Sequence, residues 1–190
     1  MSLNKLCQTT FYRRLLLLCA VLFMASCGGG TGDDLNPSGS DKRVDGTAGE
    51  VGPQVGQKMA DFSLATTDGN VYTRDDLLAT GQPFVLYFTM WCPICDTHMS
   101  HYRNQLAPDF PGVTYLLVDF VSGSITASRD SQISAGYRSA TTLVDDKTLE
   151  NALEASMGTT VVVGLDGLIY LNEDYKTGDR LRQVLETLTQ

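Results

Sequence analysis

A continuous apolar run, Phe84 to Phe88, is followed four residues later by Cys92 and Cys95, and this arrangement limits the possible folds more than any other feature of the sequence. Five apolar residues in a row are typical of a buried strand, and Pro93 directly after the first cysteine is typical of the first turn of a helix. Such a junction would place Cys92 at the positive end of the helix dipole, where the thiolate is stabilised and the pKa falls. The sequence therefore predicts a redox-active pair between a strand and a helix, with a Cys92 pKa below that of free cysteine.

Two other uses of a cysteine pair at this spacing are weaker. A zinc site needs four ligands, and the sequence contains no second CxxC and no HxxxH to complete one. A purely structural disulfide between Cys92 and Cys95 would close a very short loop and would stabilise the fold little through chain entropy. Thiol–disulfide exchange is therefore the favoured interpretation.

The first segment of the chain predicts export. Three basic residues precede the apolar run Leu15 to Met24, which is too short to span a bilayer but has the length of a signal-peptide core. The next residues, Ala25-Ser26-Cys27, resemble a bacterial lipobox, in which the cysteine becomes the lipidated first residue of the mature chain. We expect residues 1–26 to be a lipoprotein signal peptide and Cys27 to be lipidated. A plain secretory signal, which would leave Cys27 as a free thiol, is the alternative.

The division of the rest of the chain follows from composition. Residues 28–53 are rich in Gly, Asp, Ser and Pro and carry almost no large apolar side chains, so they cannot bury enough surface to fold. We therefore expect residues 27–54 to be a lipidated cysteine with a disordered linker, and residues 55–190 to be one folded domain. Cys7 and Cys19 lie in the predicted signal peptide, so Cys92 and Cys95 would be the free thiols of the mature chain.

The charge of the chain argues against nucleic acid as a partner. Residues 1–26 contain three basic and no acidic residues, so the remaining chain carries 11 Lys and Arg against 22 Asp and Glu. This acidic excess repels phosphate backbones and anionic lipid surfaces. Attachment to a membrane would therefore depend on the acyl chains and not on a basic patch.

Within residues 55–190, strand and helix patterns alternate, which predicts an α/β fold with a mixed central sheet flanked by helices. A turn at residues 67–70 predicts an N-terminal β-hairpin extension ahead of the first helix. The predicted strands are 62–66, 71–72, 84–89, 113–120, 142–144, 160–163 and 168–171. The predicted helices are 73–78, 93–106, 129–138, 148–155 and 179–188.

Motifs spread along the domain resemble one family, the TlpA/ResA-like redoxins of the thioredoxin superfamily. The matching segments are residues 55–64, Asp68-Gly69, the block Phe88 to Cys95 with its Trp-Cys-Pro-x-Cys core, residues 159–163 and Asp166-Gly167. The resemblance covers nearly the whole domain, and the block around the cysteines is its most specific part.

This resemblance implies a thioredoxin-like fold and an enzyme, a thiol–disulfide oxidoreductase that uses no cofactor and no metal. Cys92 would be the exposed nucleophile and Cys95 the resolving thiol, with Trp91, Pro93 and Ile94 in supporting positions. The partners would be protein thiols or disulfides and a further redox partner protein.

The segment Met157, Gly158 and Thr159 matches the family's substrate-docking loop but departs from it at one position. The family usually carries a cis-proline just before the two threonines, and this chain has Gly158 there. A cis bond before a residue other than proline costs about 3 kcal/mol. We therefore expect a trans bond between Met157 and Gly158 and an altered mode of substrate docking.

A second departure concerns the proton acceptor of the resolving thiol. Thioredoxins carry a buried acid where this chain has Leu86, and ResA-like members usually carry a glutamate where it has His98. His98 stands one helical turn after Cys95, and imidazole titrates near neutral pH, so His98 is a candidate base for the resolving step. An exposed helix histidine without a role is the alternative.

Two rival functions remain open. Cys92, Cys95, His98 and His101 recur every three residues, and thiolates with imidazole suit copper(I) or zinc, so a metal-binding or metal-delivery protein is one alternative. A thiol peroxidase is the second, because peroxidatic redoxins share the Asp166-Gly167 hairpin. The proline of their Pro-x-x-x-Thr/Ser-x-x-Cys motif is absent here, which makes this activity secondary.

Taken together, these features predict an extracytoplasmic, membrane-anchored thiol–disulfide oxidoreductase that reduces protein disulfides. Gly28 stands directly after Cys27, where an aspartate often retains lipoproteins at the inner membrane. We therefore expect a periplasm-facing lipoprotein of the cell envelope, at the outer rather than the inner membrane.

Overall fold

The computed structural model describes residues 47–190, and a five-stranded mixed sheet forms the centre of this part of the chain. The predicted signal peptide, the lipidation site Cys27 and most of the predicted linker lie outside the described residues. The strand order is β5-β4-β3-β6-β7, and a separate two-stranded hairpin pairs β1 (Ser63–Ala65) with β2 (Val71–Thr73). The predicted mixed sheet and N-terminal hairpin are thus confirmed.

Strand β3 (Phe84–Thr89) is the central strand, and all six of its residues are buried. It runs parallel to β4 (Thr114–Asp119), in a register that pairs Phe84 with Thr114 and Thr89 with Asp119. On its other side it runs antiparallel to β6 (Thr159–Val163). The outer strands are β5 (Thr142–Val144), parallel to β4, and β7 (Ile169–Asp174), antiparallel to β6.

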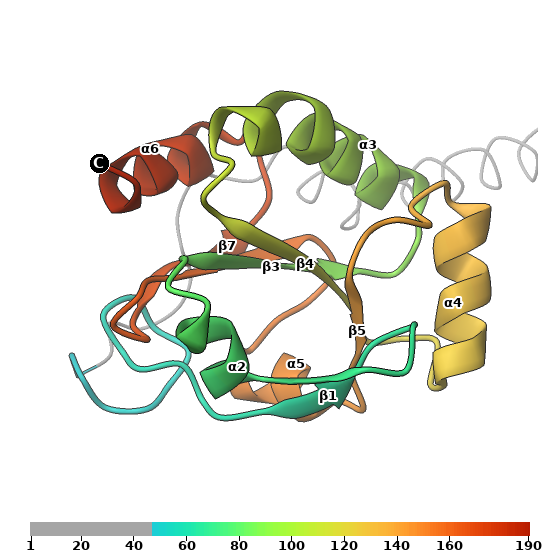
Figure 1. Ribbon diagram of the computed structural model, residues 1–190, viewed down its shortest axis with the longest axis horizontal. Coiled ribbons are helices and arrows are strands. Elements are labelled where there is room, and N and C mark those ends of the chain that lie inside the picture. Colours follow the sequence, from blue (N-terminus) through green and yellow to red (C-terminus); the bar gives the residue numbers. More distant parts are fainter. Residues whose placement is uncertain (1–46) are drawn as a thin grey trace, which may run out of the picture. The chain divides into compact units, whose positions relative to one another are not determined.

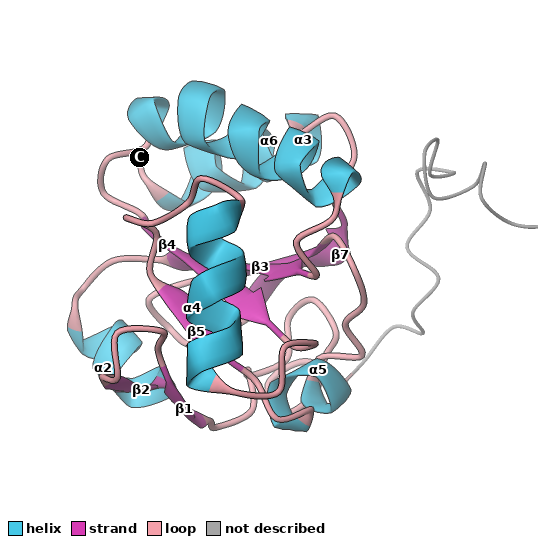
Figure 2. Cartoon of the chain, turned by 90° about the vertical axis from the view of Figure 1, so that its right-hand side faces the viewer, coloured by secondary structure: helices cyan, strands magenta, loops and turns pink. Residues whose placement is uncertain are grey.

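Helices cover both faces of the sheet (Figure 1). Helices α3 (Pro93–His101) and α6 (Asp179–Leu188) lie over one face. Helices α2 (Arg74–Ala79) and α5 (Thr148–Ala152) lie over the other, together with the β1–β2 hairpin. Figure 2 shows the same layers from the side, with α4 (Ile125–Ser134) crossing in front of them.

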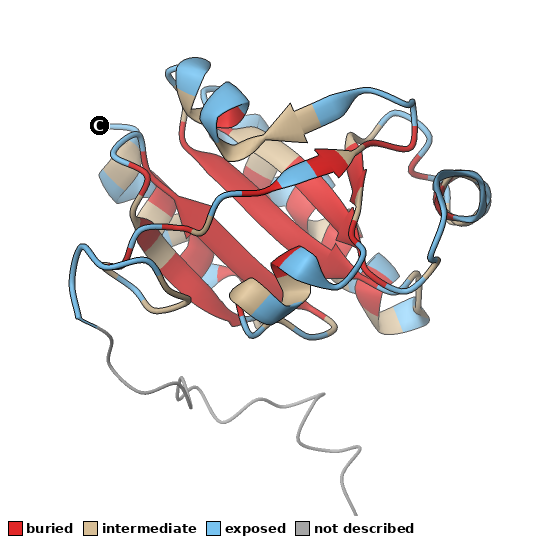
Figure 3. Ribbon diagram, turned by 90° about the horizontal axis from the view of Figure 1, so that it is seen from below, coloured by how far each residue is buried: buried red, intermediate tan, exposed pale blue. Residues whose placement is uncertain are grey.

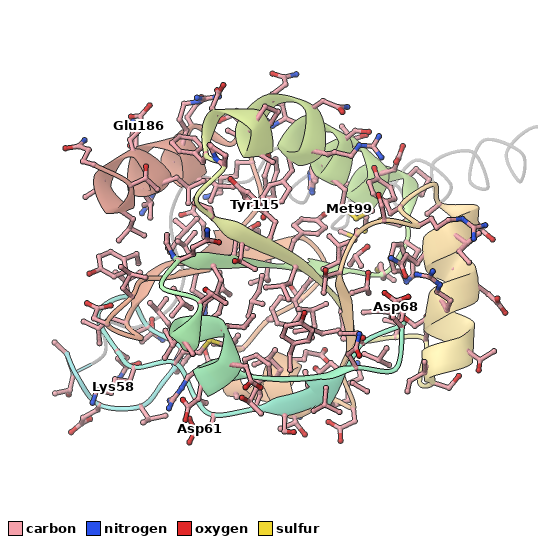
Figure 4. All side chains as sticks on the ribbon, viewed as in Figure 1. Lys58, Asp61, Asp68, Met99, Tyr115 and Glu186 are labelled. Atoms are coloured by element: carbon pink, nitrogen blue, oxygen red, sulfur yellow. The ribbon has the colours of Figure 1, made fainter. Side chains whose placement is uncertain are left out.

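Because successive side chains of a strand point to opposite faces, β3 contributes to both hydrophobic cores. Val85 and Tyr87 belong to the core beneath α3 and α6, whereas Phe84, Leu86 and Phe88 belong to the core on the α2 and α5 side. In Figure 3 the strands form a buried layer between helices that are exposed on their outer surfaces. Figure 4 shows Met99 of α3 facing this layer and Glu186 of α6 pointing away from it.

Three predicted helices differ from the structure at their ends. The predicted helix 93–106 is α-helical only to His101, continues as a π-helix over Tyr102–Leu106 and ends in a 3-10 turn over Ala107–Asp109. The prediction of 129–138 is wrong by four residues, because the Ser124 hydroxyl accepts the N–H of Ala127 and so starts α4 earlier. Helix α5 ends at residue 152 rather than 155.

The folded part of the chain begins before Val55, so the predicted linker 27–54 is too long at its C-terminal end. The N–H of Gly49 donates to the carbonyl of Gly56 (2.9 Å), and the N–H of Gly52 donates to the carbonyl of Lys58 (3.1 Å). The carbonyl of Pro53 accepts a hydrogen bond of 2.8 Å from the side chain of Asn172 on β7. Composition missed this segment because backbone groups, not apolar side chains, attach it to the domain.

In the described residues, no helix combines the length and apolar character needed to cross a membrane.

Candidate active site

Cys92 and Cys95 lie at the start of α3, directly beyond the buried end of β3. Cys92 is the N-cap residue of the helix, and its sulfur accepts the N–H of Cys95 at 3.2 Å. Both thiols are free, and the two Sγ atoms lie 2.7 Å apart. Cys92 is half-buried, whereas Cys95 is fully buried. The pair thus consists of one accessible sulfur and one protected sulfur within bonding reach of each other.

The predicted lowering of the Cys92 pKa is wrong in this structure. Burial, followed by the hydrogen bond with the Cys95 thiol, raises the pKa of Cys92, and the N–H groups of Cys95 and Ile94 oppose this only in part. The two N–H groups at the start of α3 therefore do not compensate for the loss of water around the sulfur. Cys92 remains largely a thiol near neutral pH.

Trp91 is held in a left-handed backbone conformation, with φ of 59°, directly before Cys92. Its indole N–H donates to Asp119 Oδ2 at 2.7 Å, and its backbone N–H donates to Thr89 Oγ1 at 3.1 Å. Left-handed backbone is costly for a non-glycine residue and persists where surrounding contacts fix it. Asp119 and Thr89 supply these contacts from the paired ends of β4 and β3.

Asp119 is a buried carboxylate that the sequence analysis missed. Its Oδ1 accepts the N–H groups of Val121 and Ser122, each at 3.0 Å, while its Oδ2 accepts from Trp91. Burial acts to raise the pKa of Asp119, but hydrogen bonds from Ser122, Ser128 and Trp91 outweigh it, and the pKa lies below its ordinary value. The parallel register of β3 and β4 brings Asp119 beside the active-site strand, 28 residues away from Trp91 in sequence.

The predicted docking loop lies against the nucleophile, although the contact comes from a methionine. Met157 Sδ is 3.3 Å from Cys92 Sγ. Gly158 has a φ of 85°, its N–H donates to the carbonyl of Phe88 (2.9 Å), and its carbonyl accepts the N–H of Tyr175 (2.8 Å). No peptide bond among the described residues is cis, as expected for Met157–Gly158. Proline could not adopt this φ, and it has no N–H with which to donate this hydrogen bond.

Thr159, the third residue of the predicted docking loop, is the first residue of β6. It is fully buried, its Oγ1 accepts the N–H of Ser156 (2.9 Å) and donates to Asp174 Oδ1 (3.1 Å). Thr159 therefore fixes the loop to β7, and Met157 is the loop residue whose side chain reaches the cysteines.

His98 lies beneath the loop, in contact with two tyrosines. Its Nδ1 is 2.9 Å from Tyr87 Oη, and its ring centroid is 4.7 Å from that of Tyr175. His101 Nδ1 is hydrogen-bonded to Tyr175 Oη. Burial, and then the proximity of His101, lowers the pKa of His98, so His98 is neutral near pH 7. His98 is therefore half-buried and hydrogen-bonded, not exposed as the alternative assumed.

Tyr87 is the second site residue that the sequence analysis missed. It is almost completely buried on β3, in the same buried cluster as Cys95, and its hydroxyl is hydrogen-bonded to His98 Nδ1. Burial, followed by the charges that Cys95 and Cys92 would carry, raises the pKa of Tyr87 far above its ordinary value. The period-2 pattern of β3 gave a signal, since it places Tyr87 on the face that α3 covers.

The set Cys92, Cys95 and His98 does not form a metal site in the structure. Among residues 47–190, no three His, Cys, Asp or Glu side chains converge in a way that could hold an ion. His98 directs Nδ1 at Tyr87, and His101 at Tyr175.

Comparison with known proteins agrees with this fold. The model of the AhpC/TSA family matches residues 55–150, half of the sequence, and the chain belongs to this family. Its thioredoxin-like fold confirms the resemblance to redoxins inferred from the sequence. No curated protein matches the chain.

Three solved structures illustrate the similarity. A secreted disulfide oxidoreductase of Mycobacterium tuberculosis, described as homologous to E. coli DsbE, is 23% identical (TM-score 0.53; 67% of this chain and 96% of that chain covered). Peroxidoxin BcpB of the same organism is 20% identical (TM-score 0.56; 70% and 95%). The exposed lipoprotein thioredoxin Etrx1 of Streptococcus pneumoniae is 25% identical (TM-score 0.51; 68% and 100%).

Asp119→Asn should destabilise the protein by about 1–3 kcal/mol at pH 7, because an amide cannot accept from both Trp91 and the Val121–Ser122 backbone. Since the folded pKa of Asp119 lies below 3.8, its stabilisation is complete above the unfolded pKa and is lost as the pH falls through the folded pKa. The difference between wild type and variant should therefore shrink below about pH 4. Urea unfolding followed by the fluorescence of Trp91, the only tryptophan, measures it.

Asp109→Asn is the matched control, because Asp109 forms an exposed ion pair with Arg182 and should contribute at most about 1 kcal/mol. Equal effects of the two substitutions at pH 7 would contradict the role of Asp119.

Gly158→Pro should destabilise the protein by about 3 kcal/mol or more, because it removes the hydrogen bond to Phe88 and demands a negative φ. Gly158→Ala should cost about 1–2 kcal/mol for the left-handed backbone alone. Gly112→Ala, at a glycine with open space and no positive φ, is the control and should change stability little. Chemical denaturation of the three variants tests this order, and a Gly158→Pro variant as stable as wild type would refute it.

Proposed function

We propose that this chain is an extracytoplasmic, membrane-anchored thiol–disulfide oxidoreductase that reduces protein disulfides with Cys92 and Cys95. The observation that carries the proposal is the pairing of an accessible and a buried thiol, with sulfur atoms 2.7 Å apart, at the start of a helix. Membership of the AhpC/TSA family and the thioredoxin-like fold support thiol chemistry at this position.

The reaction follows from the accessibility of the two sulfurs. The Cys92 thiolate attacks one sulfur of a partner disulfide, forms a mixed disulfide and releases the other partner sulfur as a thiolate. The Cys95 thiolate then attacks Cys92 Sγ, which forms the Cys92–Cys95 disulfide and releases the second partner sulfur. The partner gains two electrons and two protons, and the oxidised chain requires a further redox protein to reduce it.

The ionisation of Cys92 supports reduction rather than oxidation of partners. A strongly oxidising pair is one whose reduced form is stabilised, as occurs when the nucleophilic thiolate has a low pKa. Burial and the neighbouring Cys95 thiol raise the pKa of Cys92, so its reduced form lacks this stabilisation. The pair should therefore donate its electrons to disulfides of higher potential.

Exposed apolar side chains near Trp91 support a protein as the partner. Met90 is 44% exposed and Val121 is 45% exposed, although both are large and apolar. Val121 lies close to Trp91, because Asp119 accepts hydrogen bonds from both residues. Apolar surface of this kind is used to contact other proteins.

Both rival functions have weaker support. For copper or zinc delivery, residues 47–190 bring together no three His, Cys, Asp or Glu side chains in a way that could hold an ion. For peroxide reduction, the family and the similarity to peroxidoxin BcpB are favourable. However, the Thr89 hydroxyl, three residues before Cys92, is fully buried and is therefore not accessible to a peroxide.

For the remainder of the chain, we infer a signal peptide over residues 1–26, a lipid on Cys27 and a tether that leads to the redoxin domain, whose folded part begins before Val55. The lipobox-like residues before Cys27 support this assignment, and one similar structure is itself an exposed lipoprotein thioredoxin. Gly28 favours the outer over the inner membrane.

Cys95→Ser should trap the reaction halfway, because the second sulfur can no longer release the partner. With insulin as the protein disulfide, mass spectrometry under non-reducing conditions should detect a covalent adduct through Cys92. Cys92→Ser should form no adduct, and the wild type should turn over with a dithiol reductant. Equal adduct formation by both serine variants would refute the assigned roles, and reduction that needs bound copper(I) would favour the metal hypothesis.

Cys27→Ser should release the chain from the membrane fraction, because the acyl chains are its expected anchor. Cys19→Ser, within the predicted signal peptide, is the control and should leave membrane attachment intact. Mass spectrometry of the N-terminal peptide of the wild type should show an acylated Cys27. An unmodified Cys27 in a membrane-bound chain would contradict lipidation.

A further inference from the structure

Cys95 must lose a proton before it can attack the mixed disulfide, and it is fully buried. The two acids placed nearest to the cysteines by sequence or strand register are already engaged elsewhere. The carboxylate of Asp96 accepts the hydroxyl of Tyr137 at 2.7 Å. Asp119 accepts the indole N–H of Trp91. The question is therefore which group receives the Cys95 proton.

The hydroxyl of Tyr87 interacts with both the thiol of Cys95 and the imidazole of His98. Tyr87 Oη lies 2.9 Å from His98 Nδ1, and the thiol of Cys95, in the same buried cluster, acts to raise the pKa of Tyr87. The three groups come from two elements, β3 and α3, so the packing of this helix on the sheet fixes their order. Cys95, Tyr87 and His98 thus lead in this order from the buried sulfur to a half-buried imidazole.

We propose that Tyr87 relays the proton of Cys95 to His98 during the resolving step, so that His98 is the terminal base and Tyr87 the connecting group. This proposal rests on the disulfide-reducing function proposed above and assigns the proton path within that same site.

The transfer balances as follows. The Cys95 S–H proton moves to Tyr87 Oη while the original hydroxyl proton of Tyr87 moves to His98 Nδ1. Cys95 Sγ bonds to Cys92 Sγ, the bond from Cys92 to the partner sulfur breaks, and the partner leaves as a thiolate. His98 becomes an imidazolium and later releases its proton, and Tyr87 ends the step as a neutral phenol.

The surroundings of both residues suit these roles. Burial, followed by the Cys95 and Cys92 charges, raises the Tyr87 pKa, so a simultaneous exchange of protons is favoured over a free tyrosinate. The groups that face His98 are Tyr87 from β3, Cys95 and His101 from α3, and Tyr175 directly after β7. Burial and His101 keep His98 neutral near pH 7, and a neutral imidazole can accept a proton.

Tyr175 and the docking loop hold His98 in place. The Tyr175 ring lies 4.7 Å from the His98 ring at an interplanar angle of 32°. A Cβ at Gly158 would lie 3.6 Å from His98 Nδ1, so the glycine backbone passes close over the imidazole. His98 thus lies between the loop that approaches Cys92 and the tyrosine that contacts Cys95.

The test separates the two chemical steps with 5,5′-dithiobis(2-nitrobenzoate). The full chain is used with serine at positions 7, 19 and 27, so that Cys92 and Cys95 are its only thiols. In stopped flow, attack by Cys92 releases the first thionitrobenzoate, and attack by Cys95 releases the second. The first phase reports on the nucleophile, and the second reports on the proposed relay.

Tyr87→Phe and His98→Gln should each slow the second phase by about a hundredfold, the lower end of what positioned acid–base groups contribute. The first phase should change less than twofold. The double variant should be no slower than either single variant, because the two residues act in one chain. Tyr102→Phe is the matched control: its buried hydroxyl has no hydrogen-bond partner, so both phases should remain unchanged.

The pH profile distinguishes a relay from a packing effect. In the wild type the second phase should slow as the pH falls through the lowered pKa of His98, and His98→Gln should lack this limb. A second phase that changes less than twofold in both variants, or an unchanged pH profile in His98→Gln, would overturn the relay. Absence of the first phase in the wild type would instead refute the proposed function.

Discussion

The burial of β3 is the constraint on which the rest of the structure depends. All six of its residues are buried, and it pairs with β4 on one side and β6 on the other. Its alternating side chains supply both cores, so the strand can neither shift its register nor rotate without exposing one set. The cysteine pair begins directly beyond this immobile strand, and Tyr87 projects from it toward α3. The rigidity of the site is thus a consequence of the position of β3 at the centre of the sheet.

The same burial decides the chemistry of Cys92. A helix N-terminus favours a nearby negative charge by about 0.3–1 kcal/mol, and by about 2 kcal/mol in good geometry. At Cys92, desolvation and the hydrogen bond with the Cys95 thiol outweigh the N–H groups of Cys95 and Ile94, and the pKa rises. A raised pKa of Cys92 fits the proposed role as a reductant, because the reduced pair then lacks the stabilisation that a thiolate of low pKa would give.

The sequence predicted the features that depend on local pattern. The apolar run, the CxxC pair and Pro93 define the junction of β3 with α3, and the turn residues define both hairpins. Helix ends were less accurate, because a single cap such as Ser124 fixes them. The sign of the Cys92 pKa shift was wrong, since it depends on how much water the folded chain removes from the sulfur. That quantity comes from packing and has no signature in the spacing of residues.

The features that could not be predicted from the sequence depend on contacts between segments that are distant in the chain. The docking loop is an example. The sequence predicted a trans bond before Gly158 but not the conformation of this residue. Gly158 takes a left-handed backbone conformation, and its N–H donates to the carbonyl of Phe88 at the end of β3. This hydrogen bond holds the loop so close that Met157 Sδ lies 3.3 Å from Cys92 Sγ, although the two residues are 65 positions apart. The thioether thus covers one side of the nucleophile. In the function proposed above, a partner disulfide would approach Cys92 past the side chain of Met157, so the glycine that fixes this loop would also influence which partner chains reach the sulfur.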